Sequence, residues 1–235
     1  MNKGILHLLP NILAYQKSDT LPASVGTVIH SIKHFFVEEI KSTRRLLRLL
    51  DRTFDIDACT FYTINEHSHL AIADAEKLLH QGISIAFIAE AGCPGVADPG
   101  QELAAMAHRI GAIVKPYVGP NSLLLALMAS GFNGQHFQFW GYLPNKQPML
   151  AQKIKLLEQD SVSRQCSQLF IETPYRNHQL LSELIQHAHP NTRLCIAANL
   201  TADDEWIRSM RLSEWKKMDV NLHKIPAVFV LYAGD

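Results

Sequence analysis

The chain has 235 residues, of which 47% are hydrophobic and 19% charged, a composition that excludes a disordered protein and allows one large or two small domains. Basic and acidic side chains balance at 22 each, so no overall field attracts nucleic acid and any basic binding surface must be local. The four dispersed cysteines form no CxxC pair, and no apolar run has the length of a membrane span, so we expect a cytoplasmic protein without metal.

Short apolar runs alternate with amphipathic stretches, which is the pattern of parallel α/β structure. Before the turn at 119–122, we expect strands at residues 5–9, 35–37, 58–64, 83–89 and 113–117, and helices at 70–81 and 98–111. After it, we expect helices at 123–129, 153–159 and 175–187, and strands at 137–141, 168–171, 194–198 and 227–232. The turn predicts a break between two domains, residues 1–118 and 119–235.

The segment 89–100 joins a predicted buried strand to a predicted helix through three glycines and two prolines. Ligands of open α/β sheets gather beyond the carboxyl ends of strands, and Gly92 and Gly95 would let one approach the backbone closely. Asp98 is predicted to cap the next helix, with Pro99 at its first position. Composition alone supports a ligand loop and a loop whose glycines only form turns equally.

Five cations recur in steps of three and four residues and so share one face of a predicted helix: Lys41, Arg44, Arg45, Arg48 and Arg52. Such a face can hold a phosphate backbone. The alternative, which the zero net charge favours, is a solvated face of an amphipathic helix. Glu39 and Glu172 follow predicted strands, where carboxylates can serve a substrate or cofactor, although simple surface exposure is commoner there.

Several motifs follow one another along the chain: the acidic pair and basic helix at 38–47, the loop at 90–100, the Gly-Pro turn at 119–122, and the segments 170–176 and 197–201. In this order they resemble the ribosomal small-subunit RNA 2′-O-methyltransferase branch of the tetrapyrrole methylase superfamily. The chain departs from the family pattern in its first loop, 10–14, which lacks a glycine, and at Asn199, where the family has arginine.

The resemblance implies an α/β fold of two domains, tetrapyrrole-methylase-like and of methyltransferase class III, with S-adenosylmethionine in a cleft between the domains. It implies ten cofactor contacts: Pro10, Cys93, Val96, Asn121, Ser122, Leu123, Ile171, Ala198, Pro226 and Ala227. Under this resemblance, Lys41, Arg44, Arg45 and Arg48 would bind RNA phosphates. The candidates for removing a proton from a ribose hydroxyl are Glu39, Glu66, His67 and Glu172.

The resemblance also implies a cytoplasmic homodimer that acts on the ribosomal RNA of the 30S subunit, without a membrane or a metal. Two alternatives remain open at this point. One is methylation of a small molecule, a tetrapyrrole or another, and the other is a non-catalytic relative that only binds the cofactor.

Overall fold

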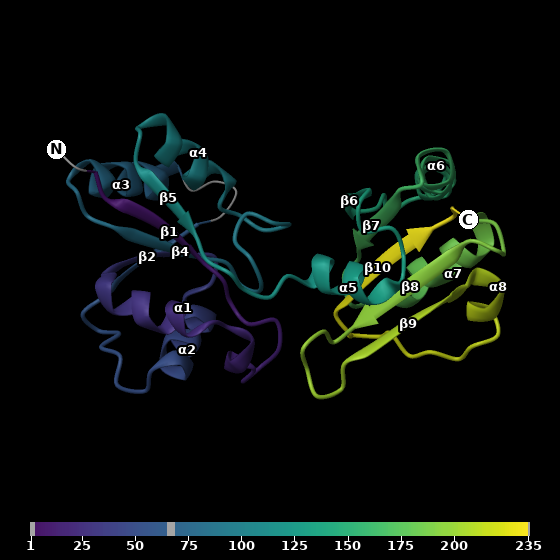
Figure 1. Ribbon diagram of the computed structural model, residues 1–235, viewed down its shortest axis with the longest axis horizontal. Helices are drawn as coiled ribbons and strands as arrows, with labels where there is room; N and C mark the ends of the chain where they lie inside the picture. Colours follow the sequence, from purple (N-terminus) through teal and green to yellow (C-terminus); the bar gives the residue numbers. More distant parts are fainter. Residues whose placement is uncertain (1–2, 65–68, 235) are drawn as a thin grey trace. The chain divides into compact units, whose positions relative to one another are not determined.

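The computed structural model describes residues 3–64 and 69–234. The chain forms two compact units, Met1–Asn121 and Ser122–Asp235, and each unit has its own five-stranded sheet (Figure 1). The division lies close to the break predicted after residue 118. Within the described residues, no helix is long and apolar enough to cross a membrane.

The first unit is built on a sheet with strand order β3-β2-β4-β1-β5 in which every pairing is parallel. Its strands are β1 (Ile5–Leu9), β2 (His34–Val37), β3 (Thr60–Thr63), β4 (Ile85–Ile88) and β5 (Ile113–Pro116). Its α-helices are α1 (Ala23–Val28), α2 (Ile40–Leu50), α3 (His69–His80) and α4 (Gln101–Arg109), and short 3-10 turns lie at Ser18–Thr20 and Ile29–Ser31. The parallel arrangement predicted from the sequence is confirmed here.

Alternate residues of these strands face two separate cores. Phe35 packs with Leu47 of α2 on one face, whereas Phe36 and Phe87 pack with helices α3 and α4 on the other. Figure 1 shows α1 and α2 on one side of this sheet and α3 and α4 on the opposite side. The apolar sequence of β4 follows from this, because a central parallel strand is covered on both faces.

The second unit has a mixed sheet with strand order β6-β7-β10-β8-β9. Its strands are β6 (Phe137–Tyr142), β7 (Ser167–Ile171), β8 (Arg193–Ala198), β9 (Trp206–Arg211) and β10 (Ala227–Tyr232). Its helices are α5 (Ser122–Ser130), α6 (Met149–Arg164), α7 (Asn177–His187) and α8 (Leu212–Trp215).

The expectation of parallel structure is wrong for most of this second sheet. Only β6 and β7 pair in parallel, while β10 runs antiparallel to both β7 and β8, and β9 runs antiparallel to β8. No long helix separates β8 from β9, so the chain returns directly, as antiparallel neighbours allow. Strand β9 is not predicted from the sequence, because its Trp-Ile-Arg-Ser-Met-Arg sequence, at the sheet edge, contains no apolar run.

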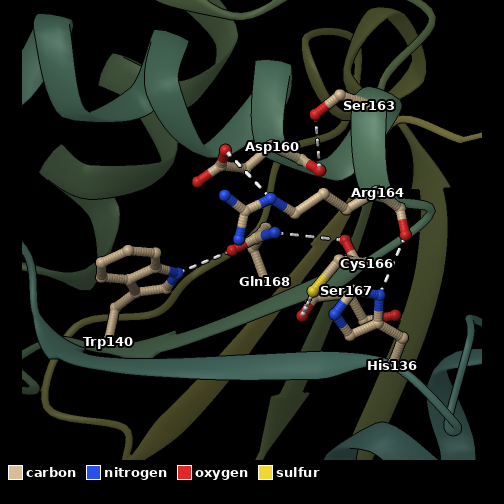
Figure 2. A network of polar contacts seen from close by, with 8 residues as sticks. All are labelled: His136, Trp140, Asp160, Ser163, Arg164, Cys166, Ser167 and Gln168. Carbon is tan, nitrogen blue, oxygen red and sulfur yellow. Dashed lines mark hydrogen bonds and ion pairs between the residues drawn. The ribbon is translucent and has the colours of Figure 1, made fainter.

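A polar network, buried at Gln168 and exposed at His136, joins β6 and β7 to the end of α6 (Figure 2). Gln168 is fully buried, and its side chain accepts a hydrogen bond from Trp140 Nε1 at 2.6 Å and donates one to the carbonyl oxygen of Cys166 at 3.3 Å. His136 Nδ1 lies 2.9 Å from the carbonyl oxygen of Arg164. Each of these bonds satisfies a polar group within the second unit, so the network stabilises the fold.

Candidate functional site

A pocket of about 960 Å³ opens in the first unit at the carboxyl ends of its strands. Four segments line it: residues 11–16 after β1, one face of α2, Arg52 and Ile56 just beyond α2, and the loop after β4 that carries Glu90, Ala91 and Asp98. Parallel sheets present their ligand sites at this edge. The glycine-rich loop after β4 therefore lies beside the basic helix α2, and both are candidate binding segments in the sequence.

Asn11 fixes the first loop against the loop after β4. Its buried side-chain amide donates hydrogen bonds to the carbonyl oxygens of Ala89 and Glu90 at 3.0 and 2.7 Å. Its backbone N–H donates to the carbonyl oxygen of Gly92 at 2.8 Å. In the sequence this loop is distinguished only by its missing glycine, whereas in the structure the buried asparagine holds the pocket wall.

Backbone geometry explains the glycines of the loop after β4. Gly92 and Gly95 have φ values of 69° and 77°, in the region that favours glycine. A Cβ on Gly92 would lie 3.2 Å from Leu13 Cδ2 and 3.5 Å from the carbonyl oxygen of Pro120, so this position faces protein atoms. Close approach of a ligand to Gly92 and Gly95 stays a prediction.

The predicted cap of the following helix is wrong. Helix α4 begins at Gln101, its N-cap residue is Gly100 with a φ of 125°, and no side chain caps it. A Cβ on Gly100 would lie 2.5 Å from Phe87 Cε1, so packing on the sheet also requires glycine there. This turn separates Asp98 from the helix, and the Asp98 side chain lines the pocket instead.

Helix α2 supplies the basic wall of the pocket. Arg44, Arg45 and Arg48 line it together with Arg52, while Lys41 is not among the lining residues. Arg44 pairs with the exposed Asp57 at 3.2 Å. Such exposed pairs contribute little, so Arg44 can exchange this partner for a phosphate.

Glu39 has a structural role at the start of α2. Its side chain accepts a hydrogen bond from the backbone N–H of Ser42 at 2.7 Å, which makes it the N-cap of the helix. The backbone N–H groups of Lys41 and Ser42 hold the pKa of Glu39 below its ordinary value. The proposal that Glu39 acts as a base thus competes with its observed role as a cap.

Three carboxylates gather where β2 and β4 end. Glu38 Oε2 accepts a hydrogen bond from the backbone N–H of Glu90 at 3.0 Å. Burial, followed by the negative charges of Glu38 and Glu90, raises the pKa of Asp98 to about 6. No group of three or more side chains suited to a metal ion occurs in the part of the chain that the structure describes.

The other three proton acceptors that the sequence suggests are Glu172, His67 and Glu66. Glu172 is buried, and its oxygens are held by Arg176 Nη2 at 3.1 Å and by the Thr173 backbone N–H at 2.7 Å. It lies in the second unit. His67, like Glu66, lies outside the described residues.

The structure brings together several of the predicted cofactor contacts of the first unit. The Cys93 thiol donates to the carbonyl oxygen of Pro120 at 3.4 Å, and burial raises the pKa of this thiol. A Cβ on Gly119 would lie only 2.1 Å from Pro10 Cβ, so the 119–121 turn packs directly on the first loop. Cys93 is therefore a neutral thiol that ties two loops together, and Val96 is 41% exposed on its own loop.

A second group of predicted contacts lies along one end of the second sheet. Ile171 and Ala198 end β7 and β8, and they pair with Val228 and Ala227 of β10. The Asn199 backbone N–H donates to the carbonyl oxygen of Pro226 at 3.0 Å. Separately in this unit, α5 begins with Ser122, which is partly exposed, and Leu123, which is buried.

Two buried polar atoms near the second group have unused hydrogen-bonding capacity. Among the described residues, Thr201 Oγ1, just beyond β8, and Asn177 Oδ1 have no hydrogen-bond partner, although the amide nitrogen of Asn177 donates to the carbonyl oxygen of Ile225 at 2.6 Å. An unsatisfied buried acceptor or hydroxyl costs about 1–3 kcal/mol, and a ligand that bonds to it removes this cost. The residues present therefore fit S-adenosylmethionine, whose amino, carboxylate and adenosyl groups offer many hydrogen bonds.

Comparison with solved structures shows the class of fold. The methyltransferase CobJ superposes with a TM-score of 0.62 at 15% identity, over 97% of this chain and 92% of that one. The Thermus thermophilus uroporphyrin-III C-methyltransferase in complex with S-adenosylhomocysteine superposes with a TM-score of 0.55 at 14% identity, over 97% of both chains. The chain thus has the fold of the tetrapyrrole methylases, the class III methyltransferases that use S-adenosylmethionine.

Comparison of sequences shows the family. The ribosomal RNA small subunit methyltransferase I of Vibrio cholerae is 34% identical over 210 residues, which are 87% of this chain and 69% of that protein. The protein of the same name from Micromonospora olivasterospora is 29% identical over 214 residues, 90% of this chain and 64% of that one. No protein-family model matches the chain. The chain belongs to the ribosomal RNA small subunit methyltransferase I family, and it spans about two thirds of the length of these relatives.

Proposed function

We propose that this protein transfers the methyl group of S-adenosylmethionine to a ribose 2′-hydroxyl of small-subunit ribosomal RNA. The observation that carries the proposal is the pocket of the first unit, which four arginines line together with the loop after β4. Guanidinium groups bind phosphate oxygens through paired hydrogen bonds, so this wall suits the backbone of a nucleic acid. Relatives at 34% and 29% identity that are named ribosomal RNA methyltransferases support the same substrate.

The cofactor carries the difficult chemistry, because it supplies a methyl group already activated on a sulfonium. The work left to the chain is binding, orientation and the exclusion of water. The proposed cofactor contacts are the loop residues Pro10, Cys93, Val96 and Asn121, and, on the second unit, Ser122, Leu123, Ile171, Ala198, Pro226 and Ala227. Orientation alone can supply much of the rate, if acceptor oxygen and methyl carbon are held about 3–3.5 Å apart.

The arginines of α2 would hold the RNA through its phosphates. Arg44, Arg45 and Arg48 keep their proposed role, and Arg52 joins them because it lines the same pocket. Lys41, which lies one turn earlier on α2 and outside the lining, would act only through its charge. Contacts of this type position the RNA but do not select its sequence.

The proposal includes a homodimer in the cytoplasm. Its support is the exposed apolar surface of α5, where Leu124 and Met128 are 47% and 79% exposed. An isologous dimer commonly buries such a surface. Sedimentation velocity of the purified protein tests this directly, and a monomer at micromolar concentration would contradict it.

The substrate is tested by incubating the protein with S-adenosylmethionine labelled in its methyl group, together with 30S subunits and, separately, a small-molecule extract. The 30S subunits come from bacteria that lack their own enzyme of this family. We expect the label in the ribosomal RNA, on ribose. Label in the small-molecule fraction alone would favour metabolite methylation, and cofactor binding without label in either fraction would indicate a non-catalytic relative.

A further inference from the structure

We propose that Asp98 is the catalytic base that takes the proton from the ribose hydroxyl as it is methylated. This inference rests on the proposed function, because it assigns a residue to that reaction. It is carried by the position of Asp98 in the same pocket as the arginines that are proposed to hold the RNA phosphates.

The surroundings of Asp98 leave its carboxylate available to a substrate. The side chain is partly buried and lines the pocket that Arg44 and Arg45 also line. In residues 3–64 and 69–234, no hydrogen bond or ion pair engages its oxygens, in contrast to the carboxylate of Glu172. Because α4 begins only at Gln101, the carboxylate is not used by the helix either.

The charged groups around Asp98 make it a stronger base than an ordinary aspartate. Glu38, at the end of β2, is fixed by its bond from the Glu90 N–H, so a negative charge is held there. Burial is the largest cause, and the negative charges of Glu38 and Glu90 act with it to raise the pKa of Asp98 to about 6. The arginines of α2 in the same pocket have the opposite effect on a carboxylate, and RNA phosphates would neutralise them. A base of this strength is ionised at neutral pH and accepts a proton more readily.

The other carboxylates near the pocket are less suited to this role. Glu39 caps α2 with its side chain, and Glu38 accepts the Glu90 N–H. Glu90 lines the pocket on the same loop as Asp98 and carries the same charge, but its side chain is exposed. It therefore provides the matched control for Asp98.

The ribose oxygen forms a bond to the methyl carbon, and its O–H bond breaks as the proton passes to Asp98. The bond from the methyl carbon to sulfur breaks, and its electron pair stays on sulfur. The products are a ribose methyl ether, neutral S-adenosylhomocysteine and protonated Asp98, which returns the proton to water.

The test is single-turnover methylation of 30S subunits by the wild type, Asp98→Asn, Asp98→Glu and Glu90→Gln between pH 5 and pH 9. General-base catalysis contributes roughly 10²–10⁴-fold, so Asp98→Asn should lower the rate about 100-fold or more. The dissociation constants of Asp98→Asn for the cofactor and for RNA should stay within about twofold of the wild-type values. If Asp98 had only a structural role, binding would weaken together with the rate. Asp98→Glu should recover part of the rate.

The pH profile separates a base from a structural residue. The wild-type rate should fall as Asp98 is protonated below about pH 6, and this limb should disappear in Asp98→Asn. Glu90→Gln removes one like charge, so its limb should move to lower pH. If Asp98→Asn keeps a rate within threefold of the wild type, if it keeps the limb, or if the limb does not move in Glu90→Gln, the inference is wrong. A wild type that methylates no RNA overturns the proposed function itself, a different result.

Discussion

The side-chain amide of Asn11 lies 2.7 Å from the carbonyl oxygen of Glu90 and donates a hydrogen bond to it. Through this bond and its partner to Ala89, the loop after β1 and the loop after β4 form one wall of the pocket. One buried side chain thus connects residues that are 79 positions apart in the sequence.

Asn11→Ala should destabilise the protein and loosen this wall. The carbonyl oxygen of Ala89, which is buried, and that of Glu90, which is partly buried, lose their donor. An unsatisfied buried acceptor costs about 1–3 kcal/mol, so we expect the free energy of unfolding to fall by about 2 kcal/mol. Urea denaturation measures it. Asn191→Ala is the control, because Asn191 is exposed and its substitution should change stability by less than about 0.5 kcal/mol. Equal stability of the two variants would show that the Asn11 bonds do not hold the wall.

Replacing Arg44 and Arg45 together by Gln should weaken RNA binding and leave cofactor binding unchanged. Each phosphate contact to a single strand contributes about 0.7 to the slope of log affinity against log salt, so the slope should fall by roughly 1.4. Fluorescence anisotropy with a labelled RNA fragment, titrated at salt concentrations from about 50 to about 300 mM, measures the RNA affinity and its salt slope. Arg109→Gln is the matched control, since Arg109 lies on α4 and pairs with Glu76 at 2.9 Å. A double variant with the salt slope of the control would remove the arginines from the proposed RNA surface.

Glu39→Ala should lower the urea midpoint because α2 loses its N-cap, and Glu39→Ser should restore it, since serine is also a good cap. The pKa of Glu39 is depressed in the folded protein, so its ionised form adds stability above the ordinary pKa of 4.5. This contribution should be lost as the pH falls through the lower, folded pKa. Comparing the midpoints of the three proteins at pH 7 and pH 3 checks this. A serine variant that is stable but unable to transfer methyl groups would instead support a catalytic Glu39.

Asp98→Asn should make the protein more stable at pH 7.5 than the wild type. The pKa of Asp98 rises from 3.8 to about 6 on folding, so ionised Asp98 disfavours the folded state. This cost is absent below pH 3.8 and complete above about pH 6. Because the side chain is partly exposed, we expect only about 1 kcal/mol at pH 7.5, and no difference near pH 4. Urea denaturation at the two pH values measures it, and a variant less stable at pH 7.5 than the wild type contradicts the raised pKa.

Many strands and helix faces of the first unit could be predicted, because the spacing of apolar residues indicates which elements form and which of their faces are buried. The run around Phe87 is apolar because β4 is covered on both faces, and the basic side chains of α2 share one face because of helical spacing. Periodicity does not reveal strand direction, however, so the antiparallel β10 at the centre of the second sheet was not foreseen.

The candidate site could be predicted only in part, because its decisive contacts join distant residues. The loop after β4 was recognised from its glycines, but Asp98 was assigned to the helix, because Asp-Pro is a common helix start. The left-handed φ of Gly100, which depends on packing against Phe87, overrides that local signal. Asn11 gave no signal of its own, since only its carbonyl partners in another loop reveal its role.

The most direct test of the central claim is nucleoside mass spectrometry of small-subunit ribosomal RNA after incubation with the wild-type protein and S-adenosylmethionine. We expect one additional 2′-O-methylated nucleoside per 30S subunit, absent when S-adenosylmethionine is omitted. Ribosomal RNA without any new ribose methylation, treated with protein that binds the cofactor, would contradict it.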